Sequence, residues 1–216
     1  MTKIDCIIIA AAGSGTRLNQ KLPKALIDIT KNKKLIDFQM DLLRDINDIR
    51  VVVGYKGNDL SSYILNKYEN VKIIENPNYD STSICNSIHM ATMDLNEPYI
   101  VMCSDLLINK NEFNNFINSF DGESLLGITP SKTQDSIYVS TNEDNEVTSF
   151  QKDFKTNFEW ANLACISKSI EIDKNSPSLF LELEKYLPLK YFLFENCFEI
   201  DTDSDLNLAL KNLDKL

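Results

Sequence analysis

Near its start, the chain has an apolar run that stops at two closely spaced glycines. Residues 7–12 read I-I-I-A-A-A, and residues 13–18 read G-S-G-T-R-L. An apolar run of this length bounded by glycine predicts a buried strand over residues 4–12 that ends in a tight turn. Because glycine has no Cβ, a ligand can approach its backbone closely, and the N–H groups of such a turn can donate to anionic oxygens. The pattern therefore predicts an anion-binding loop at the end of the first strand.

Strand-like and helix-like segments alternate through the first half of the chain. The expected strands cover residues 50–54, 71–75 and 98–104, and the expected helices cover residues 35–46, 59–68 and 83–95. This β-α-β repetition predicts a mostly parallel sheet with helices on both faces. In such folds, ligands bind beyond the carboxyl ends of the strands.

The second half has a different pattern, in which short strands are joined by polar turns. Strands are expected over residues 125–129, 137–140, 147–151, 162–167 and 191–194, and helices over residues 109–120, 177–187 and 204–213. We interpret these strands as antiparallel additions to the sheet. The expected fold is a three-layer α/β/α single domain over residues 1–216 with a mixed, mostly parallel sheet, divided near residue 108.

Composition excludes several classes of partner. The formal net charge is −10, and the basic residues are dispersed. Because nucleic acid is bound through clusters of lysine and arginine, we expect no nucleic acid partner and a small ligand instead. The five cysteines are widely spaced without a C-x-x-C pair, which indicates reduced core residues in a cytoplasmic protein. No apolar stretch approaches the roughly 20 residues that span a bilayer, so we expect no membrane partner.

The glycine loop matches neither common nucleotide motif. Leu18 stands where a dinucleotide fingerprint needs its third glycine, and the loop lacks the G-K-[ST] ending of a P-loop. The planar fork of Arg17 nevertheless suits phosphate, and Lys24 adds a mobile point charge. The alternative is an ordinary turn after a strand with two surface cations.

The whole stretch resembles a known family. The sequence A-A-G-S-G-T-R-L, followed by P-K-A-L at residues 23–26, is similar to the signature of nucleotidyltransferases that share the glycosyltransferase A-like fold. Ile9 or Ala10 stands where that family usually has leucine. The short gap between Arg17 and Lys24 resembles that of the methylerythritol-phosphate cytidylyltransferases, and the insertion typical of sugar enzymes is absent.

Three further segments resemble the bacterial phosphocholine cytidylyltransferases and their relatives. They are V-V-V-G-Y-K at residues 51–56, the segment at residues 76–91, and F-E-I-D-T-D-S-D-L-N-L-A at residues 198–209. In the second segment Thr82 and Ser87 match the family pattern, whereas Ser83 replaces the usual asparagine. The resemblance implies a nucleotide-binding half over about residues 1–108 and an acceptor-binding half over about residues 109–216. The nucleotide-binding residues that it implies are Ala11, Ala12, Gly13, Ser14, Gly15, Thr16, Arg17, Thr82, Ser83, Ser87 and Ser104.

Two aspartates are candidate metal ligands. Asp105 directly follows a buried strand, and Asp201 follows another short apolar run. Mg²⁺ takes hard oxygen ligands and usually combines one or two carboxylates with substrate phosphates, and the matching aspartates of the resembled family bind metal. Asp105 could instead be a turn residue. Asp203 and Asp205 are candidate caps for the last helix, and Glu199 is a further candidate ligand.

The resemblance implies nucleotidyl transfer from a nucleoside triphosphate with release of pyrophosphate. In this reaction Arg17 and Lys24 would be the catalytic cations: Arg17 would hold the leaving β- and γ-phosphates, and Lys24 would sit between the nucleophile and the α-phosphate. We expect CTP as the nucleotide, Mg²⁺ as the cofactor, and a small phosphorylated alcohol or phosphonate as the acceptor, in a monomer or homodimer. Glu159 and Trp160 are candidate acceptor contacts, because a tryptophan beside a carboxylate can hold a quaternary ammonium. Trp160 could equally be a core aromatic.

Other functions remain open from the sequence. The runner-up acceptor is a sugar 1-phosphate. A molybdopterin guanylyltransferase usually carries G-G-x-S-x-R-M in its loop, and a glycosyltransferase that uses a nucleotide sugar typically shows D-x-D where this chain has S-D-L at residues 104–106. A nucleotide-binding regulator without activity is disfavoured, because Arg17, Lys24, Asp105 and Asp201 are all present.

Overall fold

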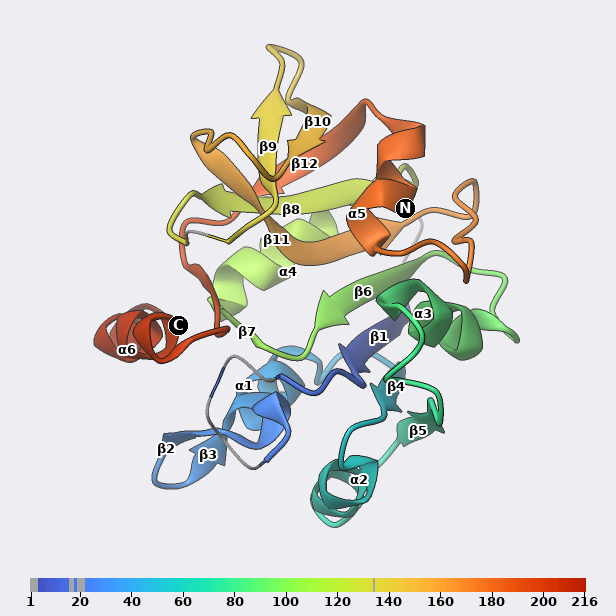
Figure 1. The fold of residues 1–216 in the computed structure, drawn as a ribbon, viewed down its shortest axis with the longest axis vertical. Helices are drawn as coiled ribbons and strands as arrows, with labels where there is room; N and C mark the ends of the chain where they lie inside the picture. The colour runs from blue at the N-terminus through green and yellow to red at the C-terminus, as the bar shows by residue number, and fades with distance from the viewer. Residues whose placement is uncertain (1–3, 16–17, 19–21, 134) are drawn as a thin grey trace.

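A mixed sheet, nine-stranded over the described part of the chain, runs through the molecule (Figure 1). The computed structural model describes residues 4–15, 18, 22–133 and 135–216. The strands of this sheet are β1 (Cys6–Ala11), β4 (Asp48–Val53), β5 (Val71–Glu75), β6 (Tyr99–Cys103), β8 (Leu125–Pro130), β9 (Tyr138–Thr141), β10 (Glu146–Gln151), β11 (Phe158–Ile166) and β12 (Leu189–Leu193). The helices are α1 (Leu35–Leu42), α2 (Gly57–Leu65), α3 (Ile84–Thr92), α4 (Lys110–Asn118), α5 (Leu179–Leu183) and α6 (Asp203–Lys211). Among the described helices, none combines the length and the apolar character needed to cross a bilayer.

The first half of the chain forms a parallel sheet covered on both faces. Its strand order is β5-β4-β1-β6, with all neighbours parallel. Alternate residues of a strand point to opposite faces, so Ile7 and Ile9 of β1 join a core cluster with α1, α2 and α4, whereas Cys6 and Ile8 join another with α3 and α5. This arrangement confirms the predicted three-layer α/β/α architecture with a mixed sheet.

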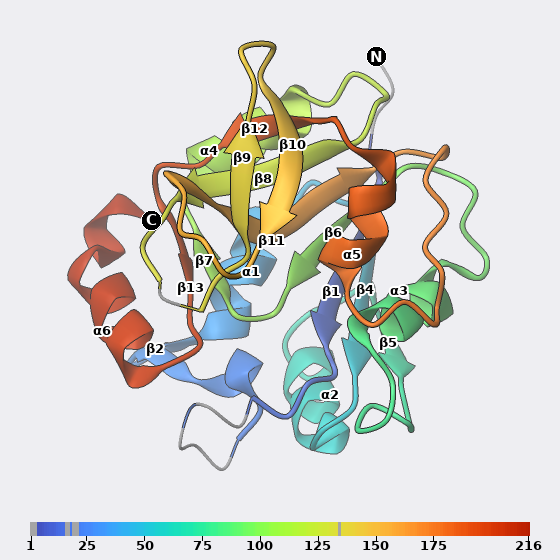
Figure 2. The same cartoon turned by 45° about the horizontal axis from the view of Figure 1, so that its top comes forward.

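The strands of the second half close on themselves. β11 pairs antiparallel with both β6 and β8, β12 pairs with β8, β10 pairs with β12, and β9 pairs with both β10 and β11. The pairings β11-β8-β12-β10-β9-β11 therefore form a ring, which we call the strand ring. Figure 2 shows these strands gathered at the top of the molecule, away from β4 and β5.

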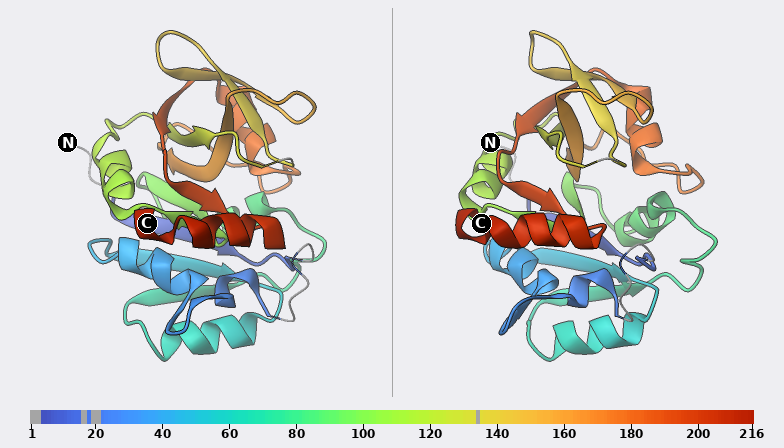
Figure 3. Two further views of the ribbon diagram at one scale, coloured as in Figure 1. Left: turned by 90° about the vertical axis from the view of Figure 1, so that its left-hand side faces the viewer. Right: turned by 60° about the vertical axis from the view of Figure 1, so that its left-hand side comes forward.

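A separate two-stranded ladder connects the two halves. β13 (Cys197–Glu199) pairs antiparallel with β7 (Leu106–Ile108), and the backbone N–H of Ile200 donates to the carbonyl of Asp105 at 2.9 Å. This ladder returns the end of the chain to the carboxyl end of β6. In both views of Figure 3, α6 lies at the level where the two halves of the molecule meet.

Several short elements differ from those expected. The sequence patterns did not predict β2 (Asp28–Thr30), β3 (Lys33–Lys34), β7 or β13, because strands of two or three residues are too short to show an alternating pattern. The expected helix over residues 177–187 is divided into α5 and the 3₁₀ helix η2 (Glu184–Tyr186). β12 pairs parallel with β8, so it is an exception to the antiparallel additions.

A buried carboxylate ties α1 to α2 and the residues that follow it. Asp37, only 2% exposed, accepts hydrogen bonds from the hydroxyls of Tyr63 and Tyr68 at 2.7 and 2.6 Å and from the backbone N–H of Lys34 at 2.8 Å. The Nζ of Lys67 lies 2.9 Å away. Burial alone would raise the pKa of Asp37, but these donors, Tyr68 foremost, lower it below its ordinary value. The ionised carboxylate is therefore part of the native structure.

We predict that Asp37→Ala lowers the free energy of unfolding by about 2–3 kcal/mol, because it leaves buried donors without an acceptor. Urea unfolding at neutral pH measures this. A group whose folded-state pKa is lowered stabilises the fold above its unfolded-state pKa, so the difference from wild type should shrink as the pH falls through the folded-state pKa of Asp37. Asp41→Ala, on the same helix, removes a more exposed carboxylate that pairs with Lys33 and Arg44 and should cost less than about 1 kcal/mol. Equal losses in the two variants would contradict the assignment.

Candidate active site

The glycine loop holds Lys24 in place and leaves room beside it. Gly15 has a positive φ of 56°, and a Cβ there would lie 2.6 Å from the Cγ of Lys24. Only glycine fits this conformation and this contact without strain. A Cβ on Gly13 would meet no described atom within 4 Å, so the backbone at that position faces open space. The loop therefore supports the lysine stem at one glycine and offers an accessible backbone at the other.

Three carboxylates meet beyond the carboxyl ends of β1 and β6. One oxygen each from Asp105, Glu199 and Asp201 lies within 4.8 Å of the other two, and we call this group the carboxylate cluster. Asp105 precedes β7, whereas the other two lie at the end of β13 and just beyond it, so the β7–β13 ladder assembles the cluster. Residues far apart in the sequence thus share one site.

The ammonium of Lys24 bridges two members of the cluster. Its Nζ donates to Asp105 Oδ2 at 3.0 Å and also to Asp201 Oδ1. Burial alone would lower the pKa of Lys24, but the carboxylates of Asp105 and Asp201 outweigh it and raise the pKa above its ordinary value. Lys24 is therefore positively charged at the centre of the site.

Glu199, half-buried like the other two carboxylates of the cluster, has a strongly perturbed pKa. Burial raises its pKa well above the ordinary value, and repulsion from Asp105 and Asp201 raises it further. Asn162 Nδ2 donates to Glu199 Oε1 at 2.9 Å. Asn162 has a positive φ of 51° and lies where the register of β11 shifts between Trp160 and Ala164. This irregularity in β11 directs the amide across to β13.

The cluster fits a divalent cation. Carboxylate oxygens are the hard ligands that Mg²⁺ takes, usually one or two of them together with water and phosphate oxygens. Asp105 Oδ1 is buried and has no hydrogen-bond partner among the described residues. A buried acceptor without a donor is costly unless a ligand satisfies it, so this oxygen and its neighbours on Glu199 and Asp201 form a suitable donor set.

Gln39 supports the turn that carries Asp105. Its side chain is fully buried, and its Nε2 donates to the backbone carbonyls of Cys103 and Leu106 at 2.9 and 3.1 Å. These two carbonyls flank Asp105 at the junction of β6 and β7. Helix α1 therefore fixes the backbone where the chain leaves the sheet at Asp105, the candidate metal ligand.

A first pocket, which we call the loop pocket, lies between the glycine loop and α3. Its volume is about 230 Å³. Its walls are made by Ala10, Ala11, Ala12, Gly13, Gly15, Lys24, Tyr79, Thr82, Ser83, Ile84, Ser87, Cys103, Ser104 and Asp105. Asn76, which is 1% exposed, shapes one side, because its Nδ2 donates to the hydroxyl oxygens of Thr82 and Ser87, each at 3.0 Å.

Ser83 has a structural task at the edge of this pocket. Its Oγ accepts from the backbone N–H of Cys85 at 3.2 Å, which caps the start of α3. The same hydroxyl donates to the carbonyl of Ser176 at 2.5 Å. A serine here thus joins the start of α3 to the segment before α5.

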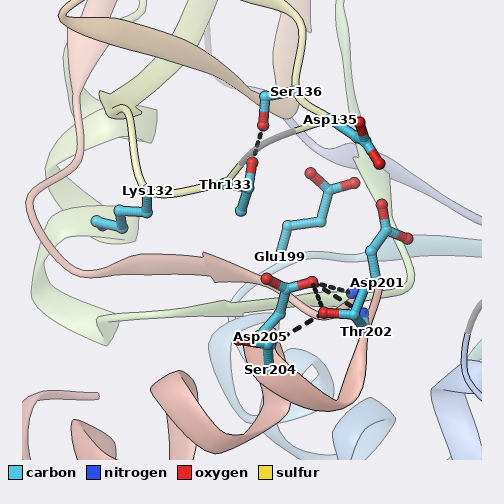
Figure 4. A pocket seen from close by; sticks show the side chains of 9 residues that line it. All are labelled: Lys132, Thr133, Asp135, Ser136, Glu199, Asp201, Thr202, Ser204 and Asp205. Carbon is cyan, nitrogen blue, oxygen red and sulfur yellow. Dashed lines mark hydrogen bonds between the residues drawn. The ribbon is translucent and has the colours of Figure 1, made fainter.

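A second pocket, which we call the acidic pocket, lies on the other side of the carboxylate cluster (Figure 4). Its volume is about 310 Å³, and it is lined by Lys132, Thr133, Asp135, Ser136, Glu199, Asp201, Thr202, Ser204 and Asp205. Figure 4 shows the carboxylates of Asp135, Glu199 and Asp201 pointing toward a common space, whereas the side chain of Lys132 points away. The Nζ of Lys132 donates instead to Thr129 Oγ1 and to the carbonyls of Glu195 and Cys197, so the pocket presents mainly negative charge.

The two candidate acceptor residues lie outside these pocket walls. Glu159 is buried and accepts from the backbone N–H groups of Lys132 and Thr133 at 3.1 and 3.2 Å, so it supports the rim of the acidic pocket from behind. Trp160 is 4% exposed, contacts Phe150 edge-on at 5.8 Å and belongs to the core. This position fits the interpretation of Trp160 as a core aromatic, and its contact with the acceptor stays a prediction.

The structure brings most of the other predicted residues together. The loop pocket contains Ala11, Ala12, Gly13, Gly15, Thr82, Ser83, Ser87 and Ser104. Ser14 is exposed and is not part of its described wall, and Thr16 and Arg17 lie outside the described residues. Sequence reasoning missed Tyr79 and four polar residues of the acidic pocket, Lys132, Thr133, Asp135 and Ser136. Tyr79 follows a recognised N-P motif at residues 76–77, whereas no pattern marks the four polar residues.

A family model decides the class of the protein. It matches residues 7–134 and describes a MobA-like NTP transferase domain. The chain belongs to this family. It is therefore a nucleotidyltransferase, and the match covers the glycine loop, Lys24 and Asp105. This assignment confirms the resemblance seen in the sequence.

Curated relatives match over part of their length. The chain is 27% identical over 108 residues to the bifunctional protein GlmU of Campylobacter fetus subsp. fetus, covering 49% of the chain and 25% of that protein. It is 26% identical over 126 residues to GlmU of a Nitratiruptor species, covering 56% of the chain and 28% of that protein. The aligned part thus spans about a quarter of the length of these relatives.

Solved structures share the fold over almost the whole chain. The inositol-1-phosphate CTP transferase of T. maritima has a TM-score of 0.78 at 20% identity, with 96% of each chain covered. The CTP:phosphocholine cytidylyltransferase LicC of Streptococcus pneumoniae has a TM-score of 0.78 at 24% identity, with 97% and 100% covered. A putative glucose-1-phosphate thymidylyltransferase of Bacillus anthracis has a TM-score of 0.80 at 15% identity, with 100% and 96% covered.

We predict that Gln39→Met lowers activity by at least tenfold and raises the divalent cation concentration needed for half-maximal activity. The reason is that groups behind metal ligands typically change affinity or activity roughly 10- to 100-fold, and this variant frees the turn that carries Asp105. Pyrophosphate release measured against cation concentration tests the prediction. Gln151→Met is the matched control, because Gln151 donates to Ser140 and Ser149 away from the site. An unchanged cation dependence in Gln39→Met would contradict the positioning role.

Proposed function

We propose that this nucleotidyltransferase moves the CMP group of CTP onto a small phosphorylated alcohol or phosphonate that carries an ammonium group, and releases pyrophosphate. The observation that carries the proposal is the pair of pockets that meet at Lys24 and the carboxylate cluster. One has an open glycine backbone suited to phosphates, and the other is strongly acidic. Their junction is where nucleotide and acceptor would react.

The loop pocket is the proposed nucleotide site. The backbone at Gly13 can approach phosphate oxygens, and the hydroxyl-bearing residues Thr82, Ser83 and Ser87 line the opposite side. Arg17, which lies outside the described residues, would hold the leaving β- and γ-phosphates. Two proteins of the same fold, LicC and the T. maritima transferase, are named for their use of CTP, which supports a cytidine nucleotide here.

The reaction needs positioning and neutralisation of charge more than a strong base. A phosphate or phosphonate oxygen of the acceptor attacks the α-phosphorus of CTP, and the bond from that phosphorus to the pyrophosphate oxygen breaks. The nucleophile is already ionised, so no proton has to be removed from it. Lys24 would neutralise the repulsion between the two anions, an electrostatic contribution that commonly gives about 10²- to 10³-fold in rate. A Mg²⁺ held by Asp105 and Asp201, with Glu199 beside them, would neutralise phosphate charge.

The chemistry of the acidic pocket favours a cationic acceptor. Beside Glu199 and Asp201, which the metal would take, Asp135 and Asp205 contribute carboxylates, and Thr133 and Ser136 contribute hydroxyls. Asp205 also accepts from Thr202 at the start of α6, so Asp135 is the carboxylate most available to an acceptor. The described lining contains no aromatic ring, whereas quaternary ammonium groups are typically held by aromatic faces. A primary ammonium can donate three hydrogen bonds to carboxylates and hydroxyls. We therefore favour 2-aminoethylphosphonate or phosphoethanolamine over phosphocholine.

A sugar 1-phosphate acceptor is the second candidate. It is favoured by the putative thymidylyltransferase that shares the fold, whose name gives glucose 1-phosphate as its substrate. The same geometry of loop, lysine and carboxylate cluster would serve it. The acidic lining argues for the ammonium-bearing acceptor, because the hydroxyls of a neutral sugar do not offset the charge of the carboxylates.

We predict that CTP with Mg²⁺ stabilises the protein more than UTP, dTTP, GTP or ATP does. A ligand at 100 times its Kd that binds only the native state adds about 2.7 kcal/mol, which corresponds to roughly 5–10 °C in Tm for a protein of this size. Thermal-shift titrations with and without Mg²⁺ measure it. Greater stabilisation by UTP or dTTP would favour the sugar 1-phosphate candidate, and greater stabilisation by GTP would favour a guanylyltransferase.

In a pyrophosphate-release assay with CTP, we predict that 2-aminoethylphosphonate or phosphoethanolamine outperforms phosphocholine and glucose 1-phosphate. Asp135→Asn should raise the KM of the favoured acceptor about fivefold and leave the KM of CTP unchanged, as expected for one exposed charged contact. The control Asp144→Asn removes an exposed carboxylate from the turn between β9 and β10. A preference for glucose 1-phosphate, or equal KM values in the two variants, would overturn the assignment of the acidic pocket.

A further inference from the structure

Lys24 occupies the place between two carboxylates that a divalent cation would share. Its ammonium bonds both Asp105 and Asp201, and the three side chains are 13%, 15% and 16% exposed. The oxygens of these aspartates lie within 4.8 Å of each other and of Glu199. The lysine is thus seated within the carboxylate cluster, not beside it.

An ammonium and a metal ion compete for these oxygens. Mg²⁺ binds its oxygen ligands at about 2.0–2.1 Å, whereas Lys24 Nζ already lies 3.0 Å from Asp105 Oδ2. Two cations held on the same carboxylates repel each other strongly, because little water separates them. Entry of the metal therefore requires the ammonium to leave at least one aspartate.

The ammonium of Lys24 can move into the loop pocket. Its Cγ, Cδ and Cε pack along Gly15, so the stem is held by the glycine loop while the terminal ammonium can turn. Lys24 lines the loop pocket together with Asp105, whereas Asp201 lines the acidic pocket. A turn at the end of the side chain would move the positive charge from the cluster into the loop pocket, where the proposed phosphates bind.

We propose that Lys24 holds the metal position in the resting enzyme and is displaced by the incoming divalent cation. The inference rests on the proposed metal site and adds an exchange of charge to it. The three carboxylates of the cluster are all negative when ionised, and Lys24 offsets one of these charges. A divalent cation offsets two of them and frees the ammonium for the nucleotide. The same lysine thus offsets the charge of the cluster before the metal binds and then serves the reaction.

The test is Mn²⁺ binding to the nucleotide-free protein, followed by electron paramagnetic resonance. Lys24→Met keeps the length of the side chain and removes its charge, so it should bind Mn²⁺ at least tenfold more tightly than wild type. Lys24→Arg should stay within about threefold of wild type. Lys34→Met is the control, because it removes the same charge from a lysine that contacts Asp28 and the carbonyl of Leu26, outside the cluster. It should change the affinity by less than about twofold.

Two further measurements distinguish displacement of Lys24 by the metal from a long-range effect of its charge on metal affinity. The Debye length is about 10 Å at 0.1 M salt and shorter above it, so a long-range charge effect fades in about 0.5 M KCl, whereas tighter binding by Lys24→Met should persist. Adding Asp105→Asn to Lys24→Met should abolish the tightening. Unchanged or weaker Mn²⁺ binding by Lys24→Met would overturn the proposal, as would tightening that survives Asp105→Asn.

Separate measurements report on folding and on activity. Melting curves without metal show whether each variant is folded, and Lys24→Gln replaces Lys24→Met if the latter is not. The binding measurement uses neither nucleotide nor acceptor, so a failure of cytidylyl transfer in the activity assays leaves its result intact. Conversely, an active wild-type enzyme with no tightening in Lys24→Met or Lys24→Gln would overturn the displacement alone.

Discussion

The active site depends on electrostatic balance around one lysine. Three carboxylates brought this close repel each other, and the raised pKa of Glu199 reflects that repulsion in addition to burial. Lys24 offsets part of it through its contacts with Asp105 and Asp201. The fold keeps these groups together against their repulsion, because the β7–β13 ladder and the buried Gln39 fix the backbone at and beside the aspartates. The rest of the architecture can be understood as support for this junction.

The two halves of the chain divide the work at that junction. The parallel strands carry the glycine loop and Asp105, whereas the strand ring carries the rim of the acidic pocket through the residues after β8. Glu159 links ring and rim by accepting two backbone N–H groups. The family match covers residues 7–134 and so includes Lys132 and Thr133 of this rim but not Asp135. The matched residues thus contain the parts shared with the family, and most of the acidic pocket is formed by residues beyond them.

Much of this could be predicted from the sequence. The alternation of strands and helices indicated the parallel sheet. The spacing of Gly13, Gly15 and Lys24 indicated the loop, because these residues lie close together in the sequence. Asp105 and Asp201 could be named from the motifs around them, but their meeting depends on a ladder of three-residue strands that shows no periodicity. Asp135 had no signal, since a polar residue in a loop has the same pattern whether it lines a pocket or not. Trp160 was ambiguous for a different reason, because a large aromatic next to a carboxylate suits a binding site and a core equally well.

The strand ring also determines how the sheet can meet another copy of the chain. β9 lies last in the strand order, yet Tyr138 and Val139, the first half of this strand, pair with β11 and so leave less of an open edge. Among the described strands, β5 is then the open edge of this sheet, with Lys72 on it near Asp48. Exposed edges invite strand addition and aggregation, and a lysine on such an edge opposes both. By pairing its far edge in part and placing a charge on its near edge, the nine-stranded sheet limits self-association through its backbone.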